Sequence, residues 1–471
     1  MIWVILLLGL SLRLISLDQS LWLDEAINVI ATQNFSLLGM ITDYAKADFH
    51  PPGYFIMLWI WTKIFGIGEI FVRIPSVVFG VLTIYVVYLL GQRIHSKTLG
   101  IFSAFLLTIS PLHIYYSQEA RMYSLAALAV SINILLLIKL IKGENFNLIF
   151  LIISNVLVLA SDYVAYFIFP AQFIFLLMIK QKIIKTWMTA LSMAILTGIW
   201  WIPTFLNQLD VGAVASANLP AWKFIVGGFD SKTVPLTFIK FIIGRISLAD
   251  KLIYGLILLP ISILFLFLIW RGIKFIITIW RNLLVIWIAV PVIIATLVSL
   301  IIPIYSYFRL QFILPAFFIL IALGILSFKS KIRYAFLIAV VLIQLFSSLV
   351  YLFNPSFHRE DWRGATNFLK NKDTLVLFES SGTLPPFDYY AKGEINASGA
   401  LKEFPAKDTE DVANLENILQ DKKDVYLIEY LVDISDPKRL VQKRLAQLNY
   451  TQADIKNFNG VGFVYHYVKS K

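Results

Sequence analysis

The chain has 471 residues, of which 59% are hydrophobic and only 15% are charged, and its formal net charge is +11. This composition excludes an ordinary soluble globular protein and indicates a polytopic membrane protein. The absence of cysteine excludes disulfides, thiolate catalysis and cysteine-based metal sites, and it leaves the compartment open.

The basic excess lies in the apolar part of the chain. Residues 354–471 contain 16 Lys and Arg against 17 Asp and Glu, a net charge of −1, so residues 1–353 carry +12. Membrane proteins concentrate Lys and Arg in cytoplasmic loops. The charge therefore implies no nucleic-acid partner, and the tail lacks the basic and aromatic pattern that nucleic-acid binding would need.

Eleven apolar stretches are candidates for membrane spans, because a span needs about 20 mostly apolar residues. They are residues 1–18, 74–91, 99–116, 123–141, 147–161, 163–179, 186–206, 252–270, 282–302, 310–328 and 334–353. The first stretch lacks a charged n-region and a small-residue cleavage site, so we expect it to be retained as a helix.

The distribution of charge predicts that the N-terminus is cytoplasmic. In that orientation the inside loops hold 13 Lys and Arg and one acid; these loops are residues 92–98, 139–145, 180–185, 271–282 and 329–333. The positive-inside rule favours this arrangement. Eleven spans then place the C-terminus outside, and we expect an integral protein of the plasma (cell) membrane.

Two long outer loops are expected, at 19–73 and 207–251. The first contains the apolar stretch GYFIMLWIWTKIFG (53–66), which is short for a span and interrupted by Lys63. We expect a helix that lies in the membrane interface.

The tail is predicted to be a separate domain. We expect a transmembrane domain over 1–353 and a soluble extracytoplasmic α/β domain over 354–471. DWRGATNFLK and PKRLVQKRLAQLN have helical patterns, whereas TLVLFES, KDVYLIEYL and GVGFVYHYV have strand patterns. A segment of about 115 residues is large enough for its own core.

The stretch LWLDEA (21–26) places two carboxylates, Asp24 and Glu25, directly behind the first apolar run. One interpretation is structural: Asp18 or Asp24 caps a helix that begins near residue 25, where acids are favourable. The other is chemical: a carboxylate acts as a general base on an acceptor hydroxyl. The residues alone leave both open.

Other ionisable groups cluster at the predicted outer ends of spans, where their burial is expensive. In DFHPPGY, Pro51 and Pro52 end an extended segment and start a helix. His50 is either a surface residue or a partner for a phosphate, and beside Asp48 it also suits a metal. Tyr54 completes this motif.

SQEARMY and YSYFRLQF contain two further arginines, Arg121 and Arg309. Each either reaches from the membrane boundary to water or binds a phosphate, for which a guanidinium is well suited. Glu119 and Tyr123 share a helical face near Arg121. Asp162, in SDYVAY, is a further acid at the end of a span.

Several catalytic motifs are absent from the sequence. There is no phosphate-cradling glycine loop with a Walker lysine, no GxSxG and no HExxH. Nucleotide hydrolysis is therefore not expected.

Five motifs in order carry a resemblance: LWLDEA, HPPGYFIMLWIW, RIPSVVFGVLTIYVVYLLGQRI, SPLHIYYSQEARMYSL and FRLQFILPAF. Together they resemble the bacterial and archaeal branch of the dolichyl-phosphate-mannose–protein mannosyltransferase family. That branch includes the lipid A aminoarabinose transferases and belongs to the type C membrane glycosyltransferases. The resemblance covers residues 1 to about 330, and REDWRGATNFL resembles the start of the branch's extracytoplasmic domain.

The resemblance implies an inverting glycosyltransferase of this membrane fold. Its donor would be a polyprenyl-phosphate-linked sugar reached from the membrane lipid, and its acceptor a hydroxyl of an unknown protein, lipid or glycan on the extracytoplasmic side. It implies that Asp24 is the catalytic base, with Glu25 as its supporting neighbour.

The resemblance also implies a donor-phosphate site. The family's His- or Lys-Pro-Pro motif corresponds to His50 and the two prolines after it, its Glu-Ala-Arg segment to Glu119 and Arg121, and its late arginine to Arg309. Aminoarabinose transferases have lysine in place of His50, which argues against that substrate. No cofactor is certain. Some relatives bind a divalent metal near this motif, where Asp48 and His50 would contribute.

Two alternatives belong to other functional classes. A transporter or flippase of a lipid-linked sugar would also need charged groups near the membrane, but the sequence has no inverted repeat and no sign of paired broken helices. A receptor would use the tail as its binding module, and the polar residues of the membrane part would then be incidental.

Overall fold

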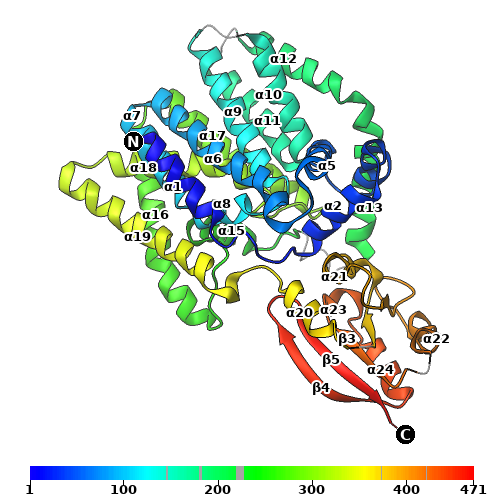
Figure 1. The fold of residues 1–471 in the computed structure, drawn as a ribbon. Coiled ribbons are helices and arrows are strands. Elements are labelled where there is room, and N and C mark those ends of the chain that lie inside the picture. The colour runs from blue at the N-terminus through cyan, green and yellow to red at the C-terminus, as the bar shows by residue number, and fades with distance from the viewer. Residues whose placement is uncertain (145–146, 180–182, 219–226, 373, 421, 471) are drawn as a thin grey trace. The chain divides into compact units, whose positions relative to one another are not determined.

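The structure is a computed structural model that describes all residues except 145–146, 180–182, 219–226, 373, 421 and 471. The chain forms two compact units (Figure 1). The first contains Met1–Leu17, Leu37–Ser216 and Lys223–Phe357, and the second contains Asp18–Ser36, Ala217–Trp222 and His358–Lys471.

The first unit is helical over its described residues. Its elements are α1 (Ile2–Leu14), α3 (Leu37–Gly39), the π-helix η1 (Met40–Tyr44), α4 (Ala45–Ala47), α5 (Gly53–Phe65), α6 (Glu69–Ile94), α7 (Lys97–Thr108), α8 (Pro111–Ser117), α9 (Tyr123–Ile141), α10 (Leu148–Ser161), η2 (Val164–Phe167), α11 (Ile168–Ile179), α12 (Ile184–Thr197), η3 (Ile199–Trp201), α13 (Ile202–Asn218), α15 (Thr233–Ile243), α16 (Lys251–Phe275), α17 (Thr278–Ser299), η4 (Gln311–Ile313), α18 (Leu314–Leu326), α19 (Ser330–Phe353) and η5 (Pro355–Phe357).

Five described helices are long and apolar enough to cross a membrane: α6, α9, α16, α17 and α19. The number rises to seven if each of two bent pairs, α7 with α8 and α12 with η3 and α13, is one span. Each of the eleven predicted stretches contains a helix, but the count of eleven spans is not confirmed. The remaining four stretches correspond to short apolar helices, at Ile2–Leu14, Leu148–Ser161, Val164–Ile179 and Gln311–Leu326.

The two bent pairs differ from the sequence prediction, which found no broken helices. The first bends by 65° and the second by 54°. α8 begins at Pro111, and a proline disfavours helical backbone in the residue before it. α12 ends at Thr197 with Gly198 as its C-cap, and the short 3₁₀ helix η3 then changes the direction of the chain. An apolar run continues through each break, so hydropathy alone does not reveal it.

α18 forms the centre of the first unit, because all of its residues are buried. It packs against α16 at two glycines: a Cβ on Gly272 would overlap the backbone of Leu320, and one on Gly324 would overlap that of Leu268. Small residues allow such close approach of helices in membranes. The predicted interfacial stretch is helical as α5, whereas its depth in the membrane stays a prediction.

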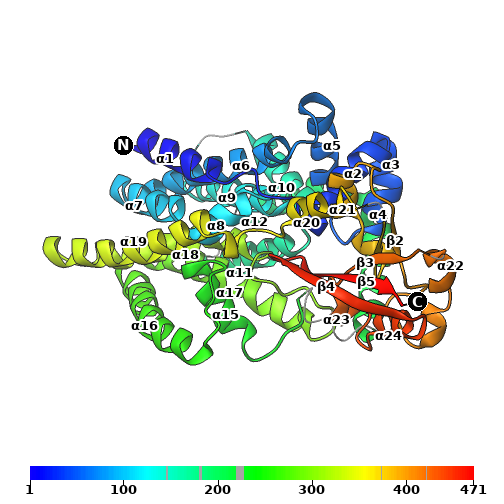
Figure 2. The same ribbon diagram turned by 60° about the horizontal axis from the view of Figure 1, so that its bottom comes forward.

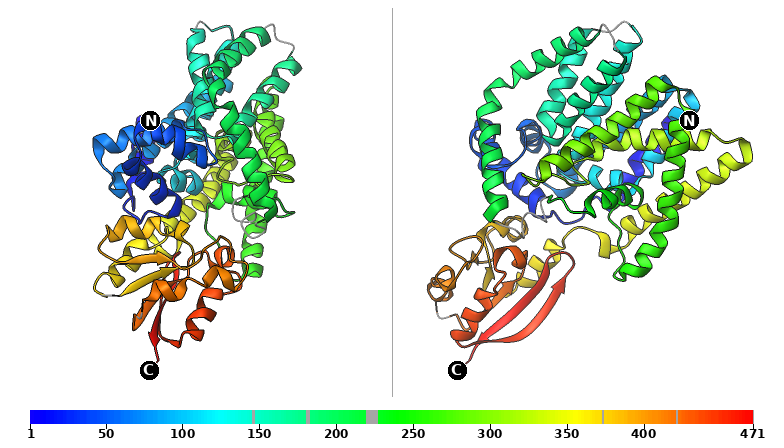
Figure 3. Two further views of the ribbon diagram at one scale, coloured as in Figure 1. Left: turned by 90° about the vertical axis from the view of Figure 1, so that its right-hand side faces the viewer. Right: turned by 180° about the vertical axis from the view of Figure 1, so that it is seen from behind.

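The second unit is an α/β domain with a five-stranded sheet (Figures 1 and 2). Its elements are α2 (Leu23–Asn34), α20 (Trp362–Leu369), β1 (Leu375–Phe378), η6 (Ser381–Thr383), α21 (Pro385–Ala391), β2 (Ala397–Gly399), η7 (Thr409–Val412), α22 (Leu415–Leu419), β3 (Asp424–Ile428), α23 (Val432–Ser435), α24 (Leu440–Gln447), β4 (Tyr450–Phe458) and β5 (Gly462–Lys469). The strand order is β2-β1-β3-β5-β4. β1 is parallel to β2 and β3, while β5 is antiparallel to β3 and β4, and the β4–β5 hairpin is the red ribbon of Figure 3.

Alternation along the central strands divides the core of this unit into two layers. Leu375 and Leu377 of β1 face one cluster, to which α22 and α24 contribute. Val376 and Phe378 face the other, with Trp362 of α20 and Phe387 of α21. Successive strand residues point to opposite faces, and a sheet covered on both faces has nearly continuous apolar strands.

The five tail elements predicted from sequence are confirmed as α20, β1, β3, α24 and β5. β4 was missed because it is an edge strand whose seven middle residues are all exposed, so it has no apolar alternation. The predicted domain boundary assigned residues 18–36 to the membrane domain. In the structure they belong to the second unit, with His358–Lys471.

Candidate active site

The acidic pair lies in the first turn of α2. The N-cap of this helix is Trp22, which makes no side-chain capping hydrogen bond, so neither Asp18 nor Asp24 is the capping residue. Asp24 and Glu25 follow within the first turn, where the helix dipole favours negative charge. The prediction that Asp18 or Asp24 caps the helix is therefore wrong, and only the favourable interaction of the two acids with the helix dipole remains.

The two carboxylates of the pair differ in exposure. Asp24 is partly exposed, whereas Glu25 is fully buried at 0%. Oε2 of Glu25 lies 4.0 Å from Nε of Arg359, and the Arg359 side chain is buried as well. A general base must be within reach of the proton that it accepts. This difference suits Asp24 for the predicted role and gives Glu25 a structural partner.

The His-Pro-Pro motif connects α4 to α5 in the first unit. His50 is 6% exposed, and its Nδ1 lies 2.5 Å from Oδ1 of Asp48. Pro51 and Pro52 are buried, and Pro52 is the N-cap of α5, as the sequence predicted for a proline at a helix start. Tyr54, in the first turn, is fully buried. When Nδ1–H donates to Asp48, Nε2 of His50 remains, and it has no hydrogen-bond partner among the described residues.

Opposing influences act on Asp48. Burial raises the pKa of Asp48. The charge and hydrogen bond of His50, together with the charge of Arg121, lower it by a larger amount, so the pKa is below its ordinary value. Asp48 is therefore ionised at neutral pH. The effect also places Arg121 within electrostatic reach of this motif, although 73 positions separate the two residues in the sequence.

Gly53 positions the motif against α10. A Cβ at Gly53 would overlap the carbonyl oxygen and Cβ of Ala160, so only glycine allows the start of α5 to approach this helix so closely. Asp162 follows as the C-cap of α10 and is 2% exposed. Its Oδ1 accepts the Val164 N–H at 2.7 Å, while Oδ2 has no hydrogen-bond partner among the described residues.

Gln208 of α13 ties a distant helix to the same loop. Its side-chain amide donates to the carbonyl oxygens of Ala45, at 2.8 Å, and Asp48, at 2.5 Å. Its carbonyl oxygen accepts the hydroxyl of Tyr163 at 2.6 Å. Sequence reasoning did not select Gln208, because nothing local distinguishes it from other polar residues in an outer loop.

Arg121 lies in the short connection between α8 and α9. It is 5% exposed, and its guanidinium carbon lies 5.9 Å from the ring centre of Tyr123. The backbone holds this turn, since Arg121 N–H donates to the carbonyl of Glu119 at 2.8 Å and Ser76 donates to the Arg121 carbonyl at 3.4 Å. Glu119 is buried as well. Arg121 is therefore not a surface arginine that reaches from the membrane boundary to water.

Arg309 approaches the same rings from the connection before α18. Its Nη1 donates to the Ile304 carbonyl at 3.3 Å, and its guanidinium carbon lies 5.9 Å from the ring of Phe308. Phe308 in turn packs on Tyr123, with ring centres 5.1 Å apart, and on Tyr116 at 5.7 Å.

A third arginine was missed from sequence. Arg245, after α15, donates to the hydroxyl of Tyr115, and its guanidinium carbon lies 4.7 Å from that ring. Tyr115 packs on Tyr116, with ring centres 5.0 Å apart. The rings of Tyr115, Tyr116, Tyr123 and Phe308 thus form one aromatic cluster, contacted by three arginines. The only sequence signal for Arg245 is an isolated cation near the end of the predicted outer loop 207–251.

The first unit therefore gathers most of the predicted residues into two groups, one at the aromatic cluster and one at the His-Pro-Pro loop. Arg121 and Arg309 meet at the aromatic cluster, with Tyr123 as part of it. Asp48 and His50 are linked to Arg121 electrostatically, and Gly53 joins their loop to the helix that ends at Asp162. Asp24 and Glu25 belong to the second unit.

A metal site was tested on the same residues. Asp48 and His50 supply one carboxylate and one imidazole, but no group of three or more His, Asp or Glu side chains among the described residues is arranged to hold a metal ion. The described side chains do not complete the site, and no step of the reaction proposed below passes through a metal.

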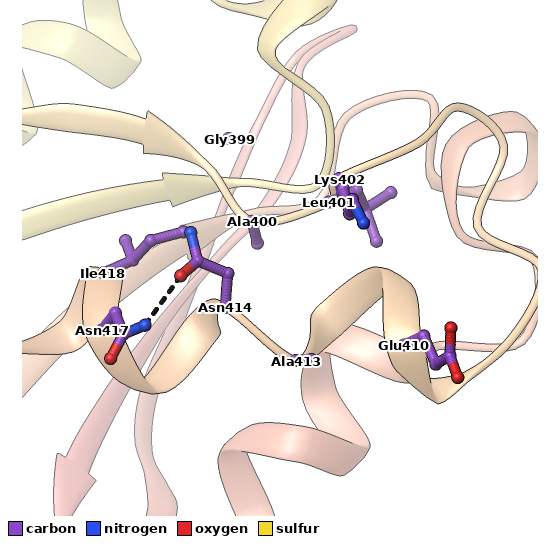
Figure 4. A pocket seen from close by; sticks show the side chains of 9 residues that line it. All are labelled: Gly399, Ala400, Leu401, Lys402, Glu410, Ala413, Asn414, Asn417 and Ile418. Carbon is purple, nitrogen blue, oxygen red and sulfur yellow. Dashed lines mark hydrogen bonds between the residues drawn. The ribbon is translucent and has the colours of Figure 1, made fainter.

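The second unit has a separate hollow with a volume of about 490 Å³ (Figure 4). It lies between the end of β2 and the start of α22, where the side chains of Asn417 and Asn414 are joined by a 2.9 Å hydrogen bond. None of the predicted site residues lines this hollow.

Comparison with known proteins gave two kinds of match. Residues 49–204 match the family model described as dolichyl-phosphate-mannose-protein mannosyltransferase. This region contains the His-Pro-Pro motif and Arg121. No match was found among curated proteins.

Among solved structures, ArnT from Cupriavidus metallidurans bound to undecaprenyl phosphate aligns with a TM-score of 0.54 and 12% identity, over 98% of this chain and 97% of that one. The oligosaccharyltransferase AglB from Archaeoglobus fulgidus, in complex with an inhibitory peptide and a dolichol-phosphate, aligns with a TM-score of 0.54 and 13% identity, over 98% of this chain and 73% of that one. An A. fulgidus oligosaccharyltransferase complex with zinc and sulfate has a TM-score of 0.56 and 14% identity, over 98% and 72%.

Over 98% of its length, the chain has the fold of ArnT and of the A. fulgidus oligosaccharyltransferase. The resemblance predicted from the five sequence motifs is confirmed by the family match and by this fold. Five to seven candidate membrane spans among the described helices accompany this fold. At 12–14% identity the structural likeness shows the fold and not the substrate.

Proposed function

We propose that the protein is an inverting glycosyltransferase. It moves a sugar from a polyprenyl-phosphate-linked donor to a hydroxyl of a protein, lipid or glycan on the extracytoplasmic side of the plasma membrane. The N-terminus is then cytoplasmic and the C-terminal domain extracytoplasmic. The family match over residues 49–204 and the lipid phosphates named in two structural neighbours support this choice.

The observation that carries the proposal is the convergence of Arg121, Arg245 and Arg309 on one aromatic cluster. A lipid-linked sugar phosphate has one negative charge, and its phosphate gains a second when the bond to the sugar breaks. Cations fixed in place before the reaction stabilise the charge that develops. Aromatic rings beside them suit the apolar sugar faces and the lipid chain.

The proposed reaction balances without a cofactor. The acceptor hydroxyl oxygen forms a bond to the anomeric carbon while the bond from that carbon to the phosphate oxygen breaks. The electron pair of the broken bond leaves with the polyprenyl phosphate, and the hydroxyl proton goes to the Asp24 carboxylate. A single carboxylate base with a separate cationic phosphate site suits inversion, since retention by double displacement needs a nucleophilic carboxylate as well.

His50 is assigned to the donor phosphate in this proposal. Its Nδ1 lies 2.5 Å from Oδ1 of Asp48, and this contact fixes the orientation of the ring. With both ring nitrogens protonated, Nε2–H donates to a phosphate oxygen. Arg121, whose charge acts on Asp48, lies near the same loop.

A binding experiment tests the phosphate site without knowledge of the sugar. Undecaprenyl phosphate is titrated into the full chain in detergent micelles and its binding is measured by native mass spectrometry. We expect Arg121→Gln and Arg309→Gln each to weaken binding by roughly tenfold, the equivalent of about 1.4 kcal/mol. Arg333→Gln is the matched control, because Arg333 of α19 donates to the carbonyls of Phe328 and Leu326, away from the aromatic cluster. Equal binding by all variants would show that Arg121 and Arg309 do not bind the donor phosphate.

A transfer experiment tests the reaction. The protein is reconstituted with tritiated polyprenyl-phosphate sugars, mannose first, and membrane fractions serve as acceptors. Asp24→Asn should lose transfer and keep the affinity for undecaprenyl phosphate. Transfer at the wild-type rate by this variant would show that Asp24 is not the base.

Two further outcomes bear on the alternatives. Translocation of the lipid-linked sugar across proteoliposomes without any transfer would favour a flippase. A loss of transfer on treatment with EDTA, restored by a divalent cation, would assign a metal to the site of Asp48 and His50.

A further inference from the structure

Residues 18–25 dock on a short stretch at the start of the C-terminal domain. The stretch is Arg359–Arg363, with the sequence REDWR. The backbone N–H of Arg359 donates to Oε1 of Gln19 at 2.9 Å, and the N–H of Arg363 donates to the hydroxyl of Ser20 at 2.8 Å. Nη2 of Arg363 donates to the carbonyl of Asp18 at 2.7 Å. Two segments far apart in the sequence are therefore joined residue by residue.

Glu360 accepts a hydrogen bond from the residue before Asp24. The backbone N–H of Leu23 donates to its Oε2 at 3.4 Å, and the same oxygen accepts Nε1–H of Trp362 at 2.7 Å. Its Oε1 accepts the hydroxyl of Tyr430 at 2.8 Å. Trp362 is fully buried and packs edge-on against Tyr430, with ring centres 4.9 Å apart. The Glu360 carboxylate is thus held by the rigid core of the domain.

Arg359 faces the residue after Asp24. Its guanidinium lies 4.0 Å from the carboxylate of Glu25, and the two side chains are 1% and 0% exposed. Removing one partner of a buried ion pair destabilises a protein much more than neutralising both partners. The pair therefore strongly favours one placement of the first turn of α2.

We propose that Arg359 and Glu360 are positioning residues for Asp24. Glu360 holds Leu23 on one side of it and Arg359 holds Glu25 on the other, so the C-terminal domain fixes the backbone from which the Asp24 carboxylate projects. This inference rests on the proposed function, in which Asp24 is the base. It gives the C-terminal domain a part in catalysis in place of a separate binding role.

The energetic argument concerns orientation and not substrate affinity. A displacement of about 1 Å at a reacting group lowers a rate by roughly 100-fold. The proposed phosphate-binding arginines belong to the other unit, so loosening α2 leaves the donor affinity unchanged. Positioning therefore predicts a loss of kcat with little change in the KM for the donor.

The test compares kinetics of the full chain in the transfer assay with tritiated polyprenyl-phosphate mannose, or with whichever sugar of the panel is transferred. We expect Arg359→Gln to lower kcat by roughly 100-fold and to change the donor KM less than twofold. Arg359→Lys should recover part of the rate, because it keeps the charge facing Glu25. The double variant Arg359→Gln with Glu25→Gln should be faster than Arg359→Gln alone, because it neutralises both members of the buried pair. Glu360→Gln should lose less than Arg359→Gln, since its amide oxygen still accepts hydrogen bonds.

Arg444→Gln is the matched control, because the partly exposed Arg444 pairs at 3.4 Å with the exposed Glu416 of the same domain. Hydrogen exchange separates positioning from folding. In Arg359→Gln, residues 18–36 should exchange faster while β1 and β3 remain protected. If Arg359→Gln lowered kcat and also removed the exchange protection of β1 and β3, Arg359 would act through folding alone. This result would overturn the proposal.

Failure of the positioning proposal and failure of the proposed function give different results. If Asp24→Asn is inactive but Arg359→Gln keeps the wild-type kcat, Asp24 remains the base and positioning by Arg359 is wrong. If Asp24→Asn transfers as fast as the wild type, the assignment of the base is wrong, and the positioning proposal falls with it.

Discussion

Glu379 provides the sharpest test of the electrostatics of the C-terminal domain. It follows β1, the neighbouring parallel strand β3 ends one residue before Glu429, and Glu379 is 1% exposed. Neither of its carboxylate oxygens has a hydrogen-bond partner among the described residues. Burial raises the pKa of Glu379 from 4.5 to about 8, and the charges of Glu429 and Asp436 raise it further, against the charge of Arg439.

The raised pKa makes the folded domain less stable as the pH increases. Below pH 4.5 the Glu379 carboxyl is protonated in both the folded and the unfolded state, so its full contribution to the stability of the fold is present. Between pH 4.5 and about 8 the unfolded chain releases the proton while the folded domain keeps it, so stability is lost until the pH passes the folded pKa. At about 1.4 kcal/mol per pKa unit, the part of this loss between pH 6 and pH 9 is roughly 3 kcal/mol.

The perturbation is Glu379→Gln, which removes the titration and nearly preserves the shape. Urea unfolding of the C-terminal domain in the full, detergent-solubilised chain is followed by pulse proteolysis at pH 6 and pH 9. We expect the wild type to lose roughly 4 kcal/mol over this range and the variant only about 1 kcal/mol. The residual comes from Glu360, whose pKa burial raises to about 7, with the same sign.

Glu416→Gln serves as the control, because the side chain of Glu416 is 67% exposed. It should reproduce the pH dependence of the wild type. The reasoning would be refuted if Glu379→Gln lost as much stability between pH 6 and pH 9 as the wild type, since a proton on Glu379 could then not be the cause.

Three further predictions follow from packing and from topology. Gly53→Val should weaken undecaprenyl phosphate binding by about tenfold, because its side chain would collide with Ala160 and displace the loop of the His-Pro-Pro motif; unchanged affinity would contradict this. Trp362→Ala should destabilise the C-terminal domain by about 3–5 kcal/mol in the urea assay, because a fully buried indole leaves a cavity; a loss below about 1 kcal/mol would contradict the assigned core. The chain has no cysteine, so Lys97→Cys and Ser470→Cys can be labelled selectively: in intact cells an impermeant maleimide should reach only the second, and the reverse pattern would invert the proposed orientation.

Local pattern was sufficient for much of the fold. Apolar runs identified a helix in each of the eleven predicted stretches, and strand patterns identified the buried strands β1 and β3 and the alternating strand β5. Pattern failed where an element lacks the burial that creates it, as in the exposed edge strand β4. It also failed at the bends of α7–α8 and α12–α13, because hydropathy counts apolar residues and is blind to the direction of the backbone.

The sequence by itself determined which residues are candidates for the proposed chemistry. Ordered motifs contained the acidic pair, the His-Pro-Pro segment and the two arginines at 121 and 309, because each motif is local and chemically unusual in an apolar chain. Only the tertiary structure decided how these residues are placed. It buried Glu25 against Arg359, brought Arg245 to the aromatic cluster and assigned residues 18–36 to the C-terminal unit. These contacts join positions a hundred or more residues apart, and burial and pairing at such separations depend on packing that no local pattern records.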